Sequence, residues 1–517
     1  MKIVSVEQMQ AIERSVDAGG LSYEQMMNNA GRGVASWVCH NLNLQRGVIG
    51  LIGSGNNGGD TLIALKDLAQ RGFRTTAFIV KQRGEDPLIQ DYLLHGGSLI
   101  DLSENQNMAF LEASLEAGTI ILDGVLGTGL KLPLRGTLFD VMGNIYQRVK
   151  KRPDTVVIAV DCPSGIDCDS GEVSDVTLPA QHTLCMAAIK QGLLIHPGRS
   201  YVGNLHLVKI GISEIESHLS DSLPEMINKN LVVKHLPSRP DSGHKGTFGT
   251  CMVIAGTKAF TGAAFLVGKA AYRSGCGLVN IATLPDVQSA LAGNLIEAVW
   301  TVLPEKDGAY AIESLAILKE KLTAVDSLVI GPGWGLQDDT REFLEALLGI
   351  IPKSIPTLFD ADGLKLLKNI ERWWERLPKN SILTPHPGEM AVLTGLDVQE
   401  IQSNRWRIAQ DYAEQWKVHL ILKGAVTVIS GPSGELLINP VSDSVLATAG
   451  SGDVLSGIIG GLLAQGASSI DACTVGTWVH SQAGVAARRQ LGSDVVVTAL
   501  DISDAISEVF KAYYSGE

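Results

Sequence analysis

The chain reads Ala447-Thr448-Ala449-Gly450-Ser451-Gly452-Asp453 and continues directly into the apolar run Val454–Leu463. Small residues in front of an apolar run predict the N-terminus of a buried helix, whose first backbone N–H groups are free to face an anion. Asp453 falls in the first turn of that helix, beside any phosphate held there. Phosphoryl transfer to a hydroxyl needs a proton-accepting carboxylate next to N–H groups that hold the transferring charge. Taken alone, the stretch fits a glycine-rich turn capped by an acid equally well.

The length and composition indicate a protein with more than one domain. A chain of 517 residues is too long for one ordinary core, and its hydrophobic fraction of 45% and charged fraction of 19% are typical of globular proteins. The formal net charge of −13 argues against binding nucleic acid through a broad basic face. It does not exclude anionic small molecules, which need only local hydrogen-bond donors.

The sequence also predicts where the protein resides. Its seven cysteines include no CxxC pair and no metal-ligand spacing, so reduced thiols in a cytosolic protein are the simplest interpretation. Residues 1–8 lack an apolar signal core, and no uncharged apolar run approaches the roughly 20 residues that span a membrane. We therefore expect a cytoplasmic protein without membrane or nucleic-acid partners. Its apolar helices rich in small residues allow self-association, so we expect a homo-oligomer.

Strand-like and helical runs alternate in the first half of the chain. Helices are expected in residues 1–45 and Asp60–Gln70, and strands at Gly47–Leu51, Thr75–Val80, Thr119–Leu122, Val156–Val160, Thr183–Ala188 and Leu205–Val208. This alternation predicts a mostly parallel sheet with helices on both faces. Ligands bind such folds at the C-terminal ends of the strands.

A second pattern of this kind follows the polar stretch Gly211–Asn230, so we expect two domains, residues 1–220 and 221–517. The strands and the closing small-residue helix of the second half are expected at Gly249–Ala255, Ser327–Ile330, Thr357–Phe359, His419–Leu422, Thr427–Ile429 and Asp471–Val485. The predicted fold class is therefore α/β, with two three-layer α/β/α domains.

A glycine-rich loop, Gly53-Ser54-Gly55-Asn56-Asn57-Gly58-Gly59-Asp60, follows the first strand and contains GxGxxG, the dinucleotide-binding pattern. That function also requires an acid near the end of the second strand, to bind the ribose. The second strand ends Val80-Lys81-Gln82-Arg83-Gly84, with no acid before Glu85. An NAD-dependent dehydrogenase is therefore disfavoured, although an arginine there would suit a 2′-phosphate.

Three oxygen-bearing residues, Asn57, Asp123 and Ser164, follow different strands and offer an amide oxygen, a carboxylate and a hydroxyl. Hard oxygen ligands of this kind suit an alkali or alkaline-earth cation and not zinc. Asp161 adds a candidate acid or base. Each acid alone is explained as the cap of a helix or turn, but their coincidence at three strand ends favours a site.

Three motifs, GSGNNGGD at 53–60, LDGVLGTGL at 122–130 and VDCPSGIDCDSG at 160–171, resemble the NAD(P)H-hydrate epimerase domain over residues 1 to about 215. The resemblance implies a Rossmann-like fold, potassium on Asn57, Asp123 and Ser164, and Asp161 as the acid or base that interconverts the epimers at C6. It also implies hydrate-binding loops formed by Asn56, Asn57, Gly58, Gly59, Asp60, Gly127, Thr128, Gly129, Leu130, Lys131, Leu132 and Pro133. A non-catalytic scaffold of this fold would be expected to lose the cation ligands and the acid, which are all present.

Six glycine-rich loops also mark the second half, nearly all at strand ends. They are His244-Lys245-Gly246-Thr247-Phe248-Gly249, Gly256–Ala263, Gly331-Pro332-Gly333-Trp334-Gly335, Asp360-Ala361-Asp362-Gly363, Thr384-Pro385-His386-Pro387-Gly388-Glu389 and Lys423-Gly424-Ala425-Val426-Thr427. Each alone has an ordinary explanation, since a histidine between two prolines suits a rigid turn. Packing alone does not call for so many flexible turns on one rim.

The order of these loops resembles the ribokinase-like superfamily and, more narrowly, the ADP-dependent NAD(P)H-hydrate dehydratase, over about residues 230 to 510. The resemblance implies that Asp453 activates the hydrate hydroxyl beside an anion hole formed by Gly450, Ser451 and Gly452. Phosphate would pass to that hydroxyl and then leave by elimination. Implied nucleotide contacts are Lys423, Gly424, Ala425, Val426, Thr427 and Gly452, and implied hydrate contacts are Ala263, Gly333, His386 and Asp453. ADP with Mg²⁺ is the expected phosphoryl donor, and ATP stays open as the alternative.

Together the two resemblances imply one bifunctional enzyme of nicotinamide-nucleotide repair. Its first half would epimerise the R hydrates of NADH and NADPH to the S form. Its second half would dehydrate the S form at the expense of ADP, giving AMP and phosphate. The alternative is a vitamin or sugar kinase fused to a non-catalytic binding domain, against which the TPHPGE motif at 384–389 and the epimerase-like half both argue.

Overall fold

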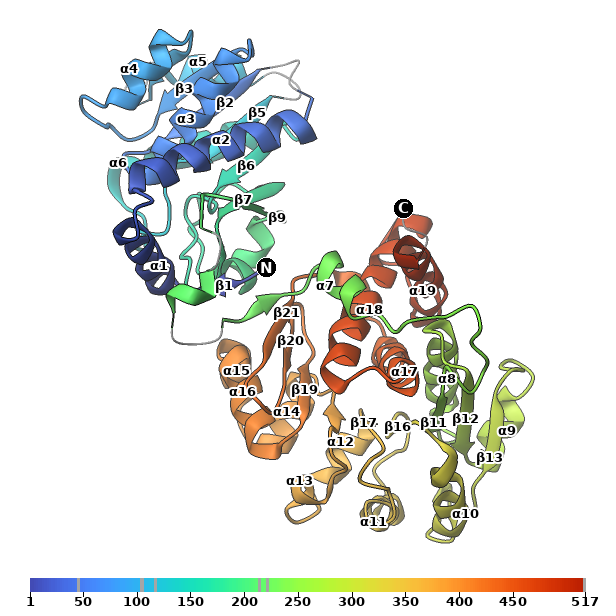
Figure 1. Cartoon of the computed structure of the whole chain (residues 1–517). Helices are drawn as coiled ribbons and strands as arrows, with labels where there is room; N and C mark the ends of the chain where they lie inside the picture. The colour runs from blue at the N-terminus through green and yellow to red at the C-terminus, as the bar shows by residue number, and fades with distance from the viewer. Residues whose placement is uncertain (44–46, 103–106, 116–118, 213–214, 220–222, 515–517) are drawn as a thin grey trace. The chain divides into compact units, whose positions relative to one another are not determined.

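The computed structural model describes residues 1–43, 47–102, 107–115, 119–212, 215–219 and 223–514. The chain forms two compact units, Met1–Pro224 and Glu225–Glu517 (Figure 1). The division between them lies within the polar stretch 211–230. Across the described residues, no helix is long and apolar enough to cross a membrane.

The first unit is built on a parallel sheet, as predicted. Within its described residues the strand order is β4-β3-β2-β5-β6-β7-β9, and each neighbouring pair is parallel. The strands are β2 (Val48–Ile52), β3 (Thr75–Ile79), β4 (Ser98–Asp101), β5 (Ile120–Gly124), β6 (Val156–Val160), β7 (His182–Met186) and β9 (Asn204–Val208). The strand order reverses between β2 and β5, and the carboxyl ends of strands at such a switch point are where this fold binds ligands.

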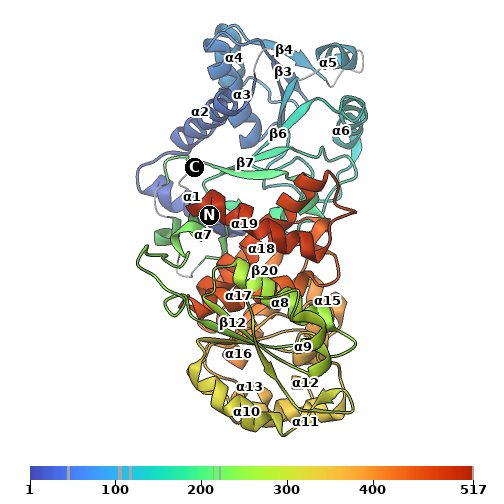
Figure 2. The ribbon, with the colours of Figure 1, turned by 90° about the vertical axis from the view of Figure 1, so that its right-hand side faces the viewer.

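Helices cover both faces of this sheet, which confirms the three-layer prediction (Figure 2). One face carries α1 (Val6–Ala18), α2 (Tyr23–Asn41), α3 (Asn56–Gln70) and α4 (Pro87–Leu94), and the other carries α5 (Met108–Ser114) and α6 (Gly136–Val149). Successive strand residues alternate between the two cores. Val48 and Ile52 pack in one core, whereas Ile49 and Leu51 pack in the other.

The second unit is built on a mixed sheet. Its strand order in the described part is β10-β21-β20-β19-β18-β17-β16-β11-β12-β13. The strand β20 is antiparallel to both of its neighbours, and the other pairs are parallel. The strands are β10 (Glu225–Met226), β11 (Thr250–Ile254), β12 (Leu278–Thr283), β13 (Val299–Val302), β16 (Ser327–Ile330), β17 (Thr357–Phe359), β18 (Ile382–Leu383), β19 (His419–Leu422), β20 (Thr427–Ser430) and β21 (Leu436–Asn439). A separate hairpin pairs β14 (Glu305–Lys306) with β15 (Ala309–Tyr310).

This sheet is also sandwiched between helices (Figure 1). Helices α8 (Thr261–Arg273), α17 (Ser451–Ala464) and α18 (Ser469–Leu491) pack on the sheet, and α19 (Ala499–Tyr514) packs on α8 and α18. The remaining helices are α7 (Lys229–Lys234), α9 (Pro285–Leu291), α10 (Ser314–Lys321), α11 (Asp338–Leu347), α12 (Asp362–Leu367), α13 (Trp373–Arg376), α14 (Pro387–Thr394), α15 (Val398–Ser403) and α16 (Arg405–Trp416). The second unit therefore has the three-layer architecture that the sequence predicts.

The helix α17 begins where the small residues predict it. Gly450 caps it with a φ of 85°, in the left-handed region that favours glycine. A Cβ at Gly450 would also lie 2.6 Å from Cδ1 of Leu266. The run Val454–Ala464 is buried all along its length, because this helix packs against the sheet, α8 and α18.

Two helices differ from the sequence prediction. The helix α3 begins at Asn56, so residues 56–59, expected in a loop, form its first turn. This turn approaches the preceding loop closely, since a Cβ on Gly58 would lie 2.2 Å from the carbonyl oxygen of Gly53. The helix α18 runs from Ser469 to Leu491, beyond the expected end at residue 485, and ends at a left-handed Gly492.

Candidate functional site

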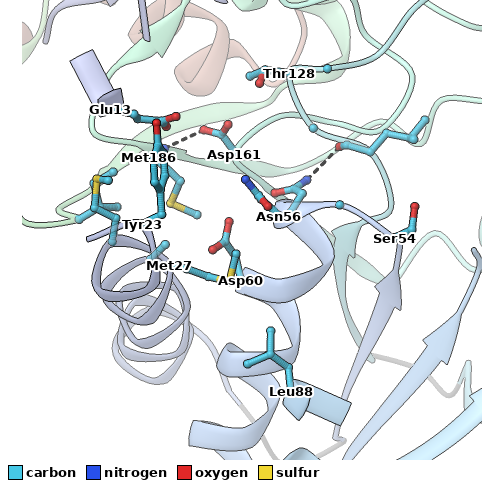
Figure 3. Close-up of a pocket in the computed structure, with 18 of the residues that line it drawn as sticks. Glu13, Tyr23, Met27, Ser54, Asn56, Asp60, Leu88, Thr128, Asp161 and Met186 are labelled. Carbon is cyan, nitrogen blue, oxygen red and sulfur yellow. Dashed lines mark hydrogen bonds between the residues drawn. The ribbon is translucent and has the colours of Figure 1, made fainter. Parts of the chain in front are cut away.

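A pocket of about 910 Å³ opens at the carboxyl ends of β2, β5 and β6 (Figure 3). Residues of α1 and α2, among them Glu13 and Tyr23, form another part of its wall. The predicted residues that line it are Asn56, Asn57, Asp60, Gly127, Thr128, Gly129, Leu130 and Asp161. The predicted residues outside its lining are Gly58, Gly59, Lys131, Leu132 and Pro133. The structure thus brings the two expected loops and the expected acid to one pocket.

A buried lysine holds Asp161 in place. Oδ1 of Asp161 accepts hydrogen bonds from the backbone N–H of Met186, at 2.9 Å, and from Nζ of Lys190. Lys190 is only 1% exposed and also donates to the carbonyls of Met186 and Ala188, at 3.2 and 3.3 Å. Burial lowers the pKa of Lys190, but the charge of Asp161 outweighs burial and raises it. Lys190 therefore stays charged at neutral pH and holds Oδ1 of Asp161, which leaves Oδ2 of Asp161 without a hydrogen bond among the described residues.

Four more carboxyl groups line the same pocket: Glu13 on α1, Glu24 on α2, Asp60 on α3, and Asp86. Burial raises the pKa of Glu13. Burial, followed by the charges of Asp161 and Glu13, raises the pKa of Asp60 well above its usual range. The pocket therefore combines a carboxyl group paired with a lysine with carboxyl groups whose pKa values are raised by burial.

The three predicted cation ligands lie together beside this pocket. The hydroxyl of Ser164 donates to Oδ1 of Asp123 at 2.6 Å, and Nδ2 of Asn57 donates to the carbonyl of Leu126 at 2.9 Å. The Ser164 hydroxyl also lies 3.4 Å from that carbonyl. Oδ1 of Asn57 is buried and has no hydrogen-bond partner among the described residues. An unpaired buried oxygen beside a carboxyl group, a hydroxyl and a carbonyl fits a hard alkali or alkaline-earth cation.

The second unit has its own cluster of predicted residues, at the N-terminus of α17. No side chain caps this end of the helix, and the N–H of Ser451 donates to the carbonyl of Thr448 at 3.2 Å, so the other N–H groups of the first turn can face an anion. The hydroxyl of Ser451 lies 2.9 Å from Nε2 of His480. Burial lowers the pKa of His480 to about 4, so its ring is neutral at physiological pH. His480 therefore fixes the Ser451 side chain without adding charge.

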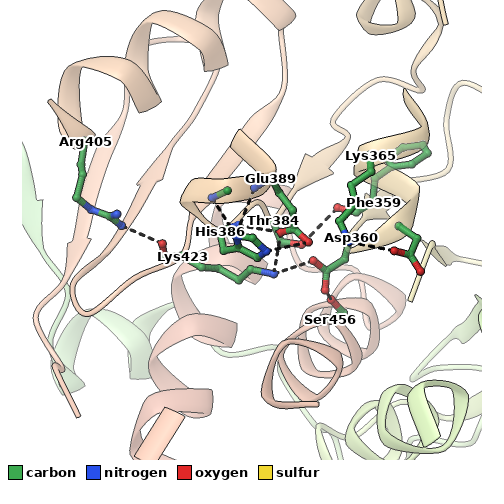
Figure 4. A network of polar contacts seen from close by, with 11 residues as sticks. Phe359, Asp360, Lys365, Thr384, His386, Glu389, Arg405, Lys423 and Ser456 are labelled. Atoms are coloured by element: carbon green, nitrogen blue, oxygen red, sulfur yellow. Dashed lines mark hydrogen bonds and ion pairs between the residues drawn. The ribbon is translucent and has the colours of Figure 1, made fainter. Parts of the chain in front are cut away.

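The ammonium of Lys423 faces this helix terminus (Figure 4). A Cβ on Gly452 would lie 3.5 Å from Nζ of Lys423. Nζ pairs with Asp360 at 2.8 Å and with Glu389 at 3.8 Å, and Asp360 also accepts from the hydroxyl of Ser456 at 2.6 Å. Burial lowers the pKa of Lys423, but the charges of Asp360 and Glu389 outweigh it and raise the pKa. A permanent positive charge thus lies next to the free N–H groups.

Asp453 has the properties of a general base that works near neutral pH. Burial raises its pKa to about 7, with a further contribution from the negative charge of Asp360. A catalytic base is most effective when its pKa lies near the working pH. Asp453 therefore lies in the first turn of α17, in the position that the predicted base would occupy, with a pKa suited to that role.

Arg405 holds the backbone of the loop 423–427 through hydrogen bonds to carbonyl groups. The guanidinium donates to the carbonyls of Leu422, Lys423 and Val426, at 2.8, 3.1 and 3.0 Å. Burial lowers the pKa of Arg405 to about 10, which still leaves it charged. Because the arginine binds the carbonyls, the loop has a fixed shape, with Gly424 and Ala425 exposed on its outer side.

Two of the predicted hydrate contacts of the second unit, Ala263 and Gly333, are neighbours, and a third, His386, caps a helix. A Cβ on Gly333 would lie 2.8 Å from Cβ of Ala263, so these two positions are neighbours. His386 caps α14, and its Nδ1 accepts from the N–H groups of Gly388 and Glu389 at 3.0 and 3.3 Å. Since Nδ1 is an acceptor, Nε2 carries the proton, and this side chain is 53% exposed. His386 thus forms a rigid turn, and its Nε2 lies 3.5 Å from Oε1 of Glu389.

Comparisons with known proteins place both units in one family. The family described as YjeF-related protein N-terminus matches residues 23–192, and the family described as NAD(P)H-hydrate dehydratase matches residues 251–508. The chain is 34% identical to the bifunctional NAD(P)H-hydrate repair enzyme Nnr of Moorella thermoacetica, over 94% of this chain and 92% of that one. The chain belongs to the bifunctional NAD(P)H-hydrate repair enzymes.

Two further proteins, a sequence relative and a solved structure, are similar to this chain. The bifunctional NAD(P)H-hydrate repair enzyme of Dictyoglomus turgidum is 32% identical to this chain and is matched over 99% of both chains. A solved structure of the ADP/ATP-dependent NAD(P)H-hydrate dehydratase of Bacillus subtilis, co-crystallized with ATP and Mg²⁺, is 30% identical. It is matched over 56% of this chain and 99% of its own, with a TM-score of 0.48.

Several residues of this repair-enzyme chain were not predicted as site residues. Lys190, Arg405 and His480 lie far along the sequence from the groups they contact, and only the folded chain shows the pairing. A lysine inside the apolar run 184–194 was the one available signal for Lys190. Asp360 and Glu389 belong to loops that the sequence singles out, but nothing in those loops shows that both contact Lys423.

Proposed function

We propose that the first unit epimerises the R hydrates of NADH and NADPH to the S form and that the second unit dehydrates the S form with ADP. The observation that carries this proposal is that one chain holds two separate acid–base sites. One is the Asp161–Lys190 pair in the pocket, and the other is Asp453 beside an open helix terminus. The names of the full-length relatives support the same pair of activities.

In the proposed dehydration, Asp453 accepts the proton of the C6 hydroxyl while that oxygen receives the phosphoryl group. Lys423 and the N–H groups of Gly450 and Gly452 stabilise the transferring charge. The N–H of Ser451, predicted as a third donor, instead binds the carbonyl of Thr448. The transfer leaves AMP. Phosphate then departs with the electron pair of the C6–O bond while C5 loses a proton to solvent, and the C5–H electron pair restores the C5–C6 double bond of the nicotinamide ring. The loop Lys423-Gly424-Ala425-Val426-Thr427, held by Arg405, binds the nucleotide, and Ala263, Gly333 and His386 bind the hydrate.

Two ions complete the proposal. Potassium would be held by Asn57, Asp123 and Ser164, where the unpaired amide oxygen fits it, and it would supply a fixed positive charge beside the hydrate loops. Mg²⁺ would accompany the phosphates of ADP and neutralise their charge. In the described part of the chain, no group of three or more His, Cys, Asp or Glu residues could hold a metal ion. The nucleotide would therefore supply most of the magnesium ligands.

The test supplies the full-length protein with mixed R and S hydrates of NADH, ADP and Mg²⁺, and follows the near-ultraviolet absorbance of reduced nicotinamide. Complete recovery at an enzymatic rate is expected, because the first unit feeds R hydrate to the second. Recovery of the S fraction alone would refute the epimerase half. The kinase alternative predicts no recovery and a stable phosphate ester of a vitamin or sugar.

The rate of dehydration should increase as pH rises through about 7, the pKa of Asp453. Only the ionised form of this carboxylate accepts a proton, so the rate should level off above that pKa. The measurement is kcat for S hydrate with saturating ADP across neutral pH. A rate that stays constant over this interval would contradict the assignment of Asp453 as the base.

Removal of potassium should slow epimerisation and leave dehydration unchanged. A bound cation stabilises the state that binds it, so potassium should also raise the melting temperature of the protein. The measurement compares R-hydrate consumption and thermal unfolding in potassium and in tetramethylammonium buffers. Asp123→Asn, which removes one charge from the site, should abolish both responses to potassium. Equal epimerisation rates in the two buffers would exclude a functional cation here.

A further inference from the structure

The pocket of the first unit holds more carboxyl groups than nearby cations can neutralise. Glu13, Asp60 and Asp161 all line it. The ammonium of Lys190 is fully engaged, since it donates to Asp161 and to two backbone carbonyls. Arg83 binds Asp86 at 2.6 Å and the carbonyls of the Gly53 loop. Neither cation is left to pair with a second or third carboxylate.

Of these three carboxyl groups, Asp60 is the one whose ionised form is least stabilised by its surroundings. Its residue is 8% exposed, and its carboxyl makes no hydrogen bond or ion pair within the described residues. It lies on α3 and points into the pocket that Asp161 enters from the end of β6 (Figure 3). The groups whose charges act on it are Asp161 and Glu13, and more weakly Lys190 and Arg83. A buried, unpaired carboxyl beside other acids keeps its proton.

We propose that Asp60 is the proton donor of the epimerase site and that Asp161 is its matching base. This inference rests on the epimerase activity proposed above for the first unit. Two carboxyl groups in different environments, on different elements of one pocket, are an arrangement that serves as acid and base in one reaction. Asp60 is buried and has no cation partner in the described part of the chain, whereas Asp161 is held by the ammonium of Lys190.

In the proposed reaction, one water molecule leaves C6 and another adds to it. Asp60 gives its proton to the C6 hydroxyl, the C6–O bond breaks, and the lone pair of the ring nitrogen forms a double bond to C6. Water then adds to the opposite face of C6 and passes a proton to Asp161. The transient positive charge on the ring is stabilised by the carboxylate of Asp60, which has just given up its proton. Proton exchange with solvent restores the starting states of both acids.

The first experiment uses Asp60→Asn in the full-length protein, with ADP omitted so that epimerisation is measured alone. We expect epimerisation to fall by about 100-fold or more, the contribution of a general acid, and the decline of the wild-type rate at high pH to disappear. Dehydration of S hydrate, assayed with ADP, should be unchanged. The matched control is Asp67→Asn, a carboxylate on the same helix that pairs with Arg71 outside the pocket.

The outcomes are distinguishable. If wild-type protein shows no epimerisation above the spontaneous rate, the proposed function fails and this inference fails with it. If wild type is active and Asp60→Asn keeps its rate and its pH profile, only the role of Asp60 is refuted.

The second experiment follows the oxygen atom. Epimerisation in water enriched with heavy oxygen should place one solvent oxygen on C6 in each turnover, above the background of heat-inactivated protein. Mass spectrometry of the hydrate measures this incorporation. Epimerisation with retention of the original oxygen would overturn the proposed cleavage of the C6–O bond.

Discussion

Asp453→Asn is expected to lower ADP-dependent dehydration of S hydrate by roughly one hundred- to ten-thousand-fold, the range for loss of a general base. The amide keeps the size and polarity of the side chain but does not accept the proton of the C6 hydroxyl. Epimerisation of R hydrate, which takes place in the other unit, should be unaffected. The measurement is the rate of recovery of nicotinamide absorbance with purified S hydrate and excess ADP.

The same substitution should stabilise the protein above neutral pH. The unfolded chain loses the proton of Asp453 near pH 4, whereas the folded protein keeps it up to about pH 7. Stability is therefore lost as pH rises from about 4 to about 7, because the folded state binds the extra proton. The asparagine variant does not undergo this loss of stability, so the melting temperature of the variant above pH 7 should exceed that of wild type. The control is Asp504→Asn, which removes an exposed carboxylate paired with Lys269.

An Asp453 variant that lost activity together with thermal stability would contradict this account, because it would show a structural role. A variant that loses activity and gains stability identifies a side chain that takes part in the chemistry although it destabilises the fold. The dehydration rate and the melting temperature of this one variant therefore separate a catalytic role from a structural role.

The features that the sequence predicts well are local. The start of α17 follows from small residues ahead of an apolar run, and both signals lie within a few residues of Gly450. The parallel sheet of the first unit follows from alternating runs of helix and strand. The polar loops gather at strand ends because a parallel sheet places all its carboxyl ends along one edge. Asp161 and Asn57 are brought together for this reason.

The features that the sequence does not predict depend on pairing across the fold. Lys190 reaches Asp161 through β8 (Ile189–Lys190), a two-residue strand that pairs with β1 (Ile3–Val4) and gives no periodic signal. Arg405 lies on α16 and contacts a loop that follows a later strand. Glycines at 58 and 59 suggest a flexible loop, but they permit close packing of the first turn of α3. Composition cannot separate these two uses of glycine.

Asp161→Asn is expected to reduce epimerisation to near the spontaneous rate, a loss of roughly one hundred- to ten-thousand-fold. The single substitution also leaves the ammonium of Lys190 buried without its partner, and breaking a buried ion pair in this way costs about 3–5 kcal/mol. A fall in activity alone would therefore not distinguish a lost base from a misfolded pocket. The measurement needs a variant that removes the base and restores the balance of charge.

The double variant Asp161→Asn with Lys190→Met meets that need. Methionine fills most of the volume of the lysine stem and carries no charge, so no uncompensated ion is left in the core. We expect the melting temperature to recover most of what the single variant loses, and epimerisation to stay at the low rate of that variant. ADP-dependent dehydration of S hydrate should match wild type in both. Recovery of epimerisation together with stability would show that the Asp161–Lys190 pair supports the fold and takes no part in the chemistry.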